Sequence, residues 1–287
     1  MNIAIVYFSF YKDKALLLQS LRAIPRLTKD GRDTITTFVF DDASSPIGPE
    51  PFAGAEVRYS TTDFPRGGNL NGTTCVLGMA ACFRNIFDAL SPDWLIKVDS
   101  DVFINDLEFL RNLDPTTVGG SGSFSELHFA HGCLYAISAY GLDAIENQLA
   151  REDVVKRMNA YHGLVQEDRM FSLLMRMGGA RQFRLEATNN PLIHGRGCYQ
   201  DFDWASVKRR ENPSYDEMLK HCGVSFKLQT CSTRSEAERD ANRADALVRL
   251  TAYADFAVEQ PLRPIEKTTE ERVSTDDTPV EESIITG

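Results

Sequence analysis

Short apolar runs rich in β-branched and aromatic residues alternate with helical segments through the first hundred residues of this chain. Residues 2–8 form one such run, typical of a buried parallel strand, and residues 34–40 form a second, β-branched run. Between them, residues 13–24 place leucine and isoleucine side chains at helical spacing, and we expect Pro25 to end that helix. Strands separated by helices indicate βαβ units, so the chain is predicted to fold around a parallel sheet.

The same alternation continues further along the chain. Residues 57–59 predict a short strand, residues 94–98 predict a fully buried one, and a helix is expected between them, after the glycine-rich stretch 66–72. The apolar residues predicted for the buried side of that helix are Val76, Leu77, Ala80, Phe83, Phe87 and Leu90. The second half is less regular, and we predict there a strand at 129–138 and helices at 142–149, 166–177 and 235–258.

Composition limits the class of protein and its partners. Apolar residues make up 43% of the 287 residues, which is typical of a globular protein with a substantial core. The formal net charge of −10 argues against nucleic acid or an anionic membrane as the main partner, because phosphate backbones and anionic headgroups need a basic surface. A single bound phosphate compound needs only a local site, so it stays compatible with this charge.

Targeting signals and cysteine usage indicate a cytoplasmic protein. No stretch approaches the ~20 apolar residues of a membrane span, and the apolar N-terminal run lacks the flanks of a signal peptide, so no transmembrane segment is expected. The six cysteines include no CxxC pair, and we expect reduced thiols. Peripheral contact with a membrane stays open for the charged, alanine-rich helix at 235–258.

The C-terminal end differs in composition from the rest of the chain. Residues 265–287 hold seven acids and two bases and almost no aromatic side chain, which predicts disorder. We therefore divide the chain into an α/β domain at 1–210, a helical extension at 211–262 and an acidic tail at 263–287.

The most informative motif follows the buried strand at 94–98, where the chain continues as Asp99-Ser100-Asp101. In an open α/β sheet, ligands bind beyond the carboxyl ends of the strands. Carboxylate oxygens suit Mg²⁺ or Mn²⁺, which can then bridge substrate phosphates. The spacing lets one acid bind a metal while the other meets a ribose hydroxyl or water. A helix cap or a turn is the other common role of aspartate at such a place.

The segment 97–105, Lys-Val-Asp-Ser-Asp-Val-Phe-Ile-Asn, resembles the metal-binding DxD segment of the GT-A glycosyltransferases. It is especially similar to that of the β-1,3-galactosyltransferase and fringe group, whereas residues 3–12 and 39–44 look more like the large inverting family 2. The resemblance extends over about residues 2–200. It implies a GT-A fold, with a Rossmann-like α/β/α arrangement around a mostly parallel central sheet.

Several residues acquire an expected donor-binding role from this resemblance. Phe8 and Ser9 end the first strand, where the family's backbone meets the nucleotide base. Asp42 would hydrogen-bond the uracil ring, although an aspartate in a turn often satisfies only its own backbone. In the glycine-rich stretch, Arg66 would offset diphosphate charge and Asn71 would meet the ribose or base. A glycine-rich turn without the resemblance indicates little.

The resemblance also implies catalytic and metal-binding residues. Asp99 would bind ribose or metal, and Asp101 would be the direct ligand of Mn²⁺ or Mg²⁺. Gly132 lies in the segment that resembles the strand lining the donor-sugar site, with His131-Gly132 in place of the usual double glycine. Glu167 and Asp168 resemble the acidic pair of inverting enzymes, in which the aspartate is the general base. Acids in the first turn of a helix are also stabilised by its dipole without any catalytic role.

A histidine later in the chain completes the expected metal site. His194 lies where several metal-dependent GT-A groups place a metal ligand, and imidazole is compatible with Mn²⁺, although a solvent-facing or packed histidine is equally common. Arg196 would neutralise the diphosphate, or would be an ordinary surface arginine.

The resemblance implies transfer of a sugar from a nucleotide-sugar donor, most often UDP-linked, to a hydroxyl of a glycan, a lipid-linked glycan or a protein, with inversion at the anomeric carbon. A non-catalytic nucleotide- or glycan-binding protein on the same scaffold is the alternative from another class. A phosphatase or phosphotransferase with a DxD motif is a weaker one, because about ninety residues precede the motif here.

Overall fold

The first strand, β1 (Asn2–Ser9), is buried on both faces because its side chains alternate between two hydrophobic cores. Ile3, Ile5 and Tyr7 belong to one core, and Ala4, Val6 and Phe8 belong to the other. A strand with two apolar faces must be covered by helices on both sides. The computed structural model describes residues 1–64, 72–124, 130–160, 166–185, 192–194, 218–226 and 235–262.

The central sheet has seven strands in the order β3-β2-β1-β4-β7-β6-β8. Its other strands are β2 (Thr34–Asp42), β3 (Val57–Thr62), β4 (Trp94–Val98), β6 (Gly120–Phe124), β7 (Ala130–Ile137) and β8 (Gln182–Leu185). Strand β7 is antiparallel to both neighbours, and the remaining pairings in this sheet are parallel. The predicted mostly parallel sheet is confirmed.

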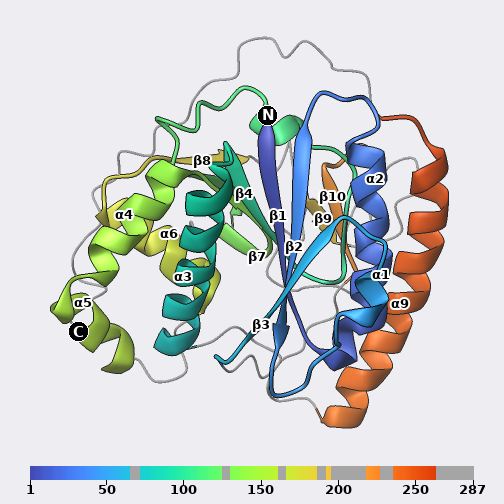
Figure 1. The fold of residues 1–287 in the computed structure, drawn as a ribbon, viewed down its shortest axis with the longest axis horizontal. Helices are drawn as coiled ribbons and strands as arrows, with labels where there is room; N and C mark the ends of the chain where they lie inside the picture. The colour runs from blue at the N-terminus through green and yellow to red at the C-terminus, as the bar shows by residue number, and fades with distance from the viewer. Residues whose placement is uncertain are drawn as a thin grey trace, which may run out of the picture.

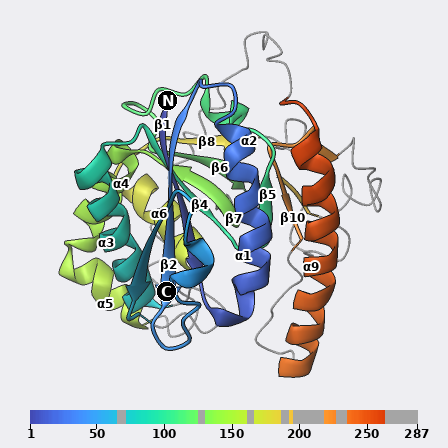
Figure 2. The same cartoon turned by 45° about the vertical axis from the view of Figure 1, so that its right-hand side comes forward.

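Helices cover both faces of this sheet, as Figures 1 and 2 show. One face packs against α3 (Thr73–Leu90), α4 (Ala139–Leu149), α5 (Glu152–Ala160) and α6 (Glu167–Met177). The opposite face packs against α1 (Lys14–Ser20) and α2 (Ile24–Leu27), and α9 (Glu236–Glu259) packs against the outer side of α1. The resulting α/β/α arrangement places the carboxyl ends of the parallel strands together at the lower edge of the sheet in Figure 1.

A second, smaller sheet lies on the α9 side of the molecule. It has three strands in the order β5 (Val102–Ile104), β10 (Gly223–Ser225) and β9 (Leu192–His194), with β10 antiparallel to β5 and parallel to β9. Strand β5 follows β4 after three residues, so this sheet begins directly beside the carboxyl end of β4.

Asn105, at the end of β5, joins the C-terminal part of the chain to this sheet. Its Nδ2 donates to the carbonyl oxygens of Met218 (3.1 Å) and His221 (2.8 Å), and its Oδ1 accepts from the hydroxyl of Tyr253 in α9 (2.8 Å). The described residues of the predicted extension at 211–262 therefore share one core with β1 and β5.

The local expectations need two corrections. Pro25 does not end the first helical segment, because it occupies the first turn of α2, where the missing N–H costs no hydrogen bond. Leu77 in α3 is exposed rather than buried. No helix in the described part of the chain is long and apolar enough to cross a membrane.

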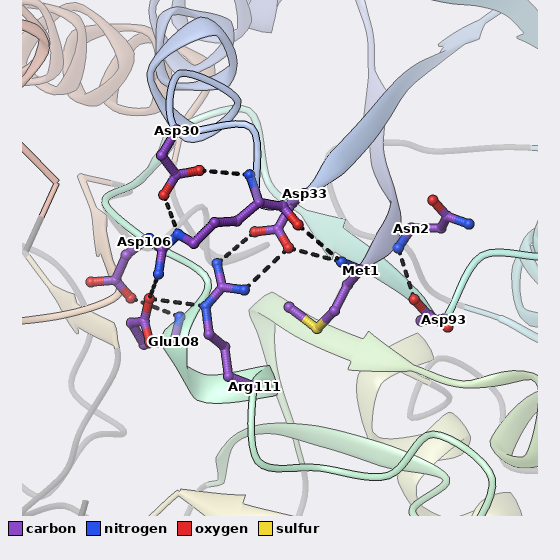
Figure 3. Close-up of polar contacts among 9 residues, drawn as sticks. Met1, Asn2, Asp30, Asp33, Asp93, Asp106, Glu108 and Arg111 are labelled. Atoms are coloured by element: carbon purple, nitrogen blue, oxygen red, sulfur yellow. Dashed lines mark hydrogen bonds and ion pairs between the residues drawn. The ribbon is translucent and has the colours of Figure 1, made fainter. Parts of the chain in front are cut away.

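A charged network lies at the amino ends of the central strands, at the edge opposite to the Asp99-Ser100-Asp101 segment (Figure 3). Asp33, directly before β2, receives hydrogen bonds from Arg111 (2.6 and 3.2 Å) and from the terminal amine of Met1 (3.1 Å). Arg111 also donates to Glu108 in the 3-10 helix Glu108–Leu110. Burial disfavours the charged form of Asp33, but these donors outweigh it and hold the pKa of this carboxyl below its ordinary value.

This network predicts an acid-sensitive contribution to stability. Because the folded-state pKa of Asp33 is depressed, its contribution is present above the unfolded-state pKa of about 4 and is lost as the pH falls through the folded value. We expect Asp33→Asn to lower the free energy of unfolding at pH 7 by about 2 kcal/mol and to flatten its dependence on pH below about 4. Urea unfolding at a series of pH values measures both effects, and an unchanged acid limb in Asp33→Asn would contradict the assignment.

Candidate active site

The polar ends of β1 and β4 meet where the strand order of the central sheet reverses. Strands β1, β2 and β3 follow one another toward one edge, whereas β4 lies on the other side of β1. The crevice beyond the carboxyl ends at such a point is where open α/β sheets bind their ligands. Ser9 ends β1, and the segment Asp99-Ser100-Asp101 follows β4, so both reach this point.

The Asp99-Ser100-Asp101 segment is held by buried hydrogen bonds on both sides. The Ser100 and Ser9 hydroxyls lie 3.1 Å apart, which ties the middle of the segment to β1. The Ser225 hydroxyl, at the end of β10, donates to Asp101 Oδ2 (3.0 Å), and the N–H of Phe226 donates to the carbonyl of Asp101 (3.1 Å). Both aspartates are buried, with 8% and 2% of Asp99 and Asp101 exposed. The second sheet therefore fixes Asp101 in place.

Lys97, two residues before Asp99 in β4, is a buried lysine within this site. Its Nζ donates to Asp99 Oδ1 (2.6 Å) and to the carbonyl oxygen of Gly132, and it lies 3.2 Å from Glu167 Oε1. The glutamate belongs to the first turn of α6, and the glycine belongs to β7. One ammonium group thus contacts two carboxylates and a backbone carbonyl from three different elements.

Asp168, the second acid of the pair at the start of α6, lies against Gly132. A Cβ built on Gly132 would approach Asp168 Oδ2 to 2.9 Å, a distance that real Cβ atoms essentially never show. The absence of a side chain at Gly132 therefore gives the carboxylate room. Asp168 Oδ1 accepts from the N–H of Arg169 (2.7 Å), and the residue is partly exposed, in contrast to the buried Glu167.

Phe8 and Asp42 lie at the carboxyl ends of the neighbouring strands β1 and β2. The Phe8 ring packs against Phe40 with 5.2 Å between centroids and is fully buried, so its side chain belongs to the core rather than to the site. Asp42 Oδ1 accepts from the N–H (2.9 Å) and the hydroxyl (2.6 Å) of Ser44, which makes a turn of the kind that aspartate commonly stabilises. The position of Asp42 is thus established, and its contact with a base stays a prediction.

His194 is brought toward Asp101 by the second sheet. It ends β9, where its register partner in β10 is Ser225, the residue whose hydroxyl binds Asp101. Neighbouring strands lie about 4.8 Å apart, so the backbone of His194 is one strand spacing from that of Ser225.

Three predicted residues, Arg66, Asn71 and Arg196, lie outside the described residues. Among the residues that the structure describes, no group of three or more His, Cys, Asp or Glu side chains is arranged to hold a metal ion. Asp99 and Asp101 provide two carboxylates at the end of β4, which is the donor chemistry that Mg²⁺ or Mn²⁺ uses when water and substrate phosphates complete its shell.

The loop that follows β1 is fastened to the start of α9. Arg243 donates to Asp13 (3.0 Å) and lies over the ring of Phe10, 5.4 Å from its centroid. Lys12 pairs with Glu236 (2.5 Å) and, at 3.3 Å, with Asp240. The C-terminal helix thus holds the segment directly after Phe8 and Ser9.

Sequence reasoning missed Lys97 and Ser225 as parts of this site. A lysine inside an otherwise apolar buried strand was a usable signal, because lysine is almost never buried unless it is paired. Ser225 carried no local signal, because it contacts Asp101 across 124 residues of chain.

Comparison with known proteins is informative at the level of three-dimensional structure. No protein-family model and no curated protein matches the chain. The crystal structure of the galactosyltransferase LgtC, solved in complex with donor and acceptor sugar analogues, matches with a TM-score of 0.51 at 14% sequence identity, over 92% of this chain and 98% of LgtC. The chain has the GT-A fold.

Two further solved structures match less well. A glycosyltransferase involved in glycosylation of the major capsid of PBCV-1 has a TM-score of 0.48 at 12% identity, over 85% of this chain and 99% of its own. Mouse xyloside xylosyltransferase 1 has a TM-score of 0.46 at 10% identity, over 82% of this chain and 100% of its own.

The burial of Glu167 predicts a second pH-dependent effect. Burial raises the pKa of this carboxyl to about 7, against the opposing charge of Lys97 and with further help from Asp168 and Asp99. A carboxyl whose folded-state pKa is raised contributes stability that is complete below its unfolded-state pKa of 4.5 and is lost as the pH rises through about 7. We expect Glu167→Gln to remove a decline in the free energy of unfolding on the order of 3 kcal/mol between pH 5 and pH 8.

Denaturant unfolding of the two proteins across that pH range measures the slope. Glu152→Gln is the matched control, because Glu152 also lies in the first turn of a helix but its side chain is 82% exposed. A slope that persists in Glu167→Gln would show that Glu167 titrates normally.

Proposed function

We propose that this protein is a metal-dependent glycosyltransferase that moves a sugar from a UDP-linked nucleotide sugar to an acceptor hydroxyl. One observation carries the proposal: Asp99 and Asp101 are buried and hydrogen-bonded at the carboxyl end of β4, beside the end of β1, where the strand order reverses. Buried carboxylates at the ligand-binding edge of a GT-A fold are suited to a cation that holds a diphosphate.

Asp101 is the proposed direct ligand of Mn²⁺ or Mg²⁺, with His194 as a further ligand and Asp99 toward ribose or metal. The supporting contacts are those of Ser225 with Asp101 and the register of His194 opposite Ser225. When bound, the cation would offset the negative charge that develops on the departing diphosphate. The ends of β1 and β2, with Phe8, Ser9 and Asp42, border the proposed nucleotide side, and Arg66, Asn71 and Arg196 remain proposed contacts of the same donor.

Asp168 is the proposed general base. An acceptor hydroxyl is a poor nucleophile, so a carboxylate must accept its proton as the oxygen attacks the anomeric carbon. Asp168 lies over Gly132 and is partly exposed, so it is open to an acceptor. Attack on the face opposite to the diphosphate inverts the anomeric configuration. The acceptor class, a glycan, a lipid-linked glycan or a protein, follows only from the resemblance.

The binding-protein alternative predicts nucleotide binding without turnover. The phosphatase alternative requires Asp99 as a free nucleophile, whereas Asp99 Oδ1 is held by Lys97 at 2.6 Å. Neither alternative uses the partly exposed Asp168 next to Gly132.

Nucleotide binding tests the donor site directly. A ligand that binds only the folded state stabilises it by about 2.7 kcal/mol at a concentration of 100 times its Kd. We expect UDP with Mn²⁺ to raise the melting temperature of the wild-type protein, and we expect the shift to vanish with chelator and in Asp101→Ala. GDP, CMP and dTDP are the comparison nucleotides, and the absence of a shift with all of them would contradict the donor site.

Removal of the proposed base separates binding from transfer. We expect Asp168→Asn to bind UDP and Mn²⁺ like the wild type. We expect its rate of transfer to fall by about 100-fold or more, because no carboxylate remains to take the proton of the attacking hydroxyl. The measurement combines UDP titration with product analysis by NMR, which also reports the anomeric configuration of the product.

A second variant checks the same carboxylate without removing it. In Gly132→Ala the new Cβ displaces Asp168 Oδ2, which is the end of a flexible side chain, so the protein should fold while transfer falls. Combining it with Asp168→Asn should add no further loss. Full activity of Asp168→Asn, or a product with retained configuration, would remove Asp168 as the base of an inverting reaction.

A further inference from the structure

Lys97 is an unusual residue for the centre of this mostly parallel sheet. It lies in β4, between β1 and β7, and only 2% of it is exposed. An ammonium group in such a place is strongly destabilising unless carboxylates and hydrogen-bond acceptors surround it. Every other residue of β4 is apolar. An apolar residue would pack better at this position, so packing does not explain the lysine.

The groups around Lys97 come from the segment after β4 and from the neighbouring elements α6 and β7. Asp99 Oδ1, at 2.6 Å, belongs to the motif that follows β4. Glu167 Oε1, at 3.2 Å, belongs to α6, and the carbonyl oxygen of Gly132 belongs to β7. The ring of Tyr135, also in β7, lies 5.7 Å from Nζ. The ammonium group is therefore the point at which β4, β7 and α6 are joined by charge.

The contacts with Glu167 and Gly132 bear on the position of Asp168. Glu167 immediately precedes Asp168, and Gly132 is the residue over which the Asp168 carboxylate lies. Lys97 thus binds Glu167, which precedes Asp168 in the chain, and also Gly132, against which the Asp168 carboxylate lies. Its third partner, Asp99, lies two residues before Asp101. Loss of the ammonium group would release both sides at once and would leave two buried carboxylates facing each other.

We propose that Lys97 is a positioning residue that joins the donor side of the site, at Asp99, to the acceptor side, at Asp168. The inference rests on the proposed function, because it assigns these two sides their roles. It adds that the two acidic groups are oriented by one shared cation of the protein itself, and that Glu167 anchors α6 rather than receiving the acceptor proton. Partners that orient such groups typically change metal affinity or activity by about 10- to 100-fold when they are removed.

The test compares two variants and a control. Lys97→Met alone leaves Asp99 and Glu167 buried without their partner and can fail to fold. The double variant Lys97→Met/Glu167→Met removes the pair between Lys97 and Glu167 together, so only one buried carboxylate, that of Asp99, loses the ammonium group, and the melting temperature reports whether the protein folds. The single variant Glu167→Met keeps the pair between Lys97 and Asp99. Arg111→Met is the control, because it breaks an ion-pair cluster at the opposite edge of the sheet.

Three quantities are measured on each full-length protein: the melting temperature, the Kd for UDP with Mn²⁺, and the kcat for transfer. We expect Glu167→Met to lower kcat by about tenfold or more with a Kd within about twofold of wild type, because only the acceptor side is released. We expect the double variant to lower kcat and also to raise the Kd by about tenfold. Arg111→Met should lower the melting temperature and leave kcat and Kd unchanged.

Hydrogen exchange provides a measurement that does not depend on catalysis. The inference predicts faster exchange of the amides at 99–101 and at 168–170 in the double variant, with no change at the amino ends of the strands. A well-folded double variant with wild-type kcat, Kd and exchange would overturn the inference and leave Lys97 as a charge-balancing residue. Failure of the proposed function is recognised separately, because the wild type would then bind no nucleotide or transfer no sugar, while the exchange experiment would still decide whether Lys97 couples the two segments.

Discussion

The two-sided burial of β1 and β4 is the constraint on which the rest of the molecule depends. Both strands lie inside the sheet and are covered by helices on both faces. A polar side chain without a hydrogen-bond partner within either strand would therefore be costly. Polar side chains therefore gather where these strands end. At that edge the hydroxyls of Ser9 and Ser100 bind each other, Asp101 binds Ser225 of the second sheet, and Asp99 binds Lys97.

Lys97 is the exception within β4, and its partners explain why it is tolerated. The desolvated ammonium group has Asp99, Glu167 and the carbonyl of Gly132 around it. Such clusters stabilise a fold little compared with an apolar core of the same volume. This one brings together the end of β4, β7 and α6. The pKa of Glu167 is raised in the same cluster, because burial and the charges of Asp168 and Asp99 outweigh the charge of the one ammonium group.

Two C-terminal elements, β10 and α9, contact segments of the candidate site. Strand β10 supplies Ser225 to Asp101, and α9 holds the loop after β1 through Arg243 and Lys12. Tyr253 of the same helix binds Asn105 at the end of β5. Residues of β10 and α9 lie in the same hydrophobic core as alternate residues of β1 and β4.

Elements that depend on near neighbours are predictable from the sequence: the strands at 2–8, 34–40 and 94–98, the helix at 166–177, and two aspartates directly after a strand. Apolar periodicity and composition act over a few residues, so they can be read without a fold. The antiparallel pairing of β7 with β4, the contact of Lys97 with Glu167 and the contact of Ser225 with Asp101 are visible only in the folded molecule. These contacts join residues far apart along the chain, and their partners are fixed only when the sheets and helices pack together.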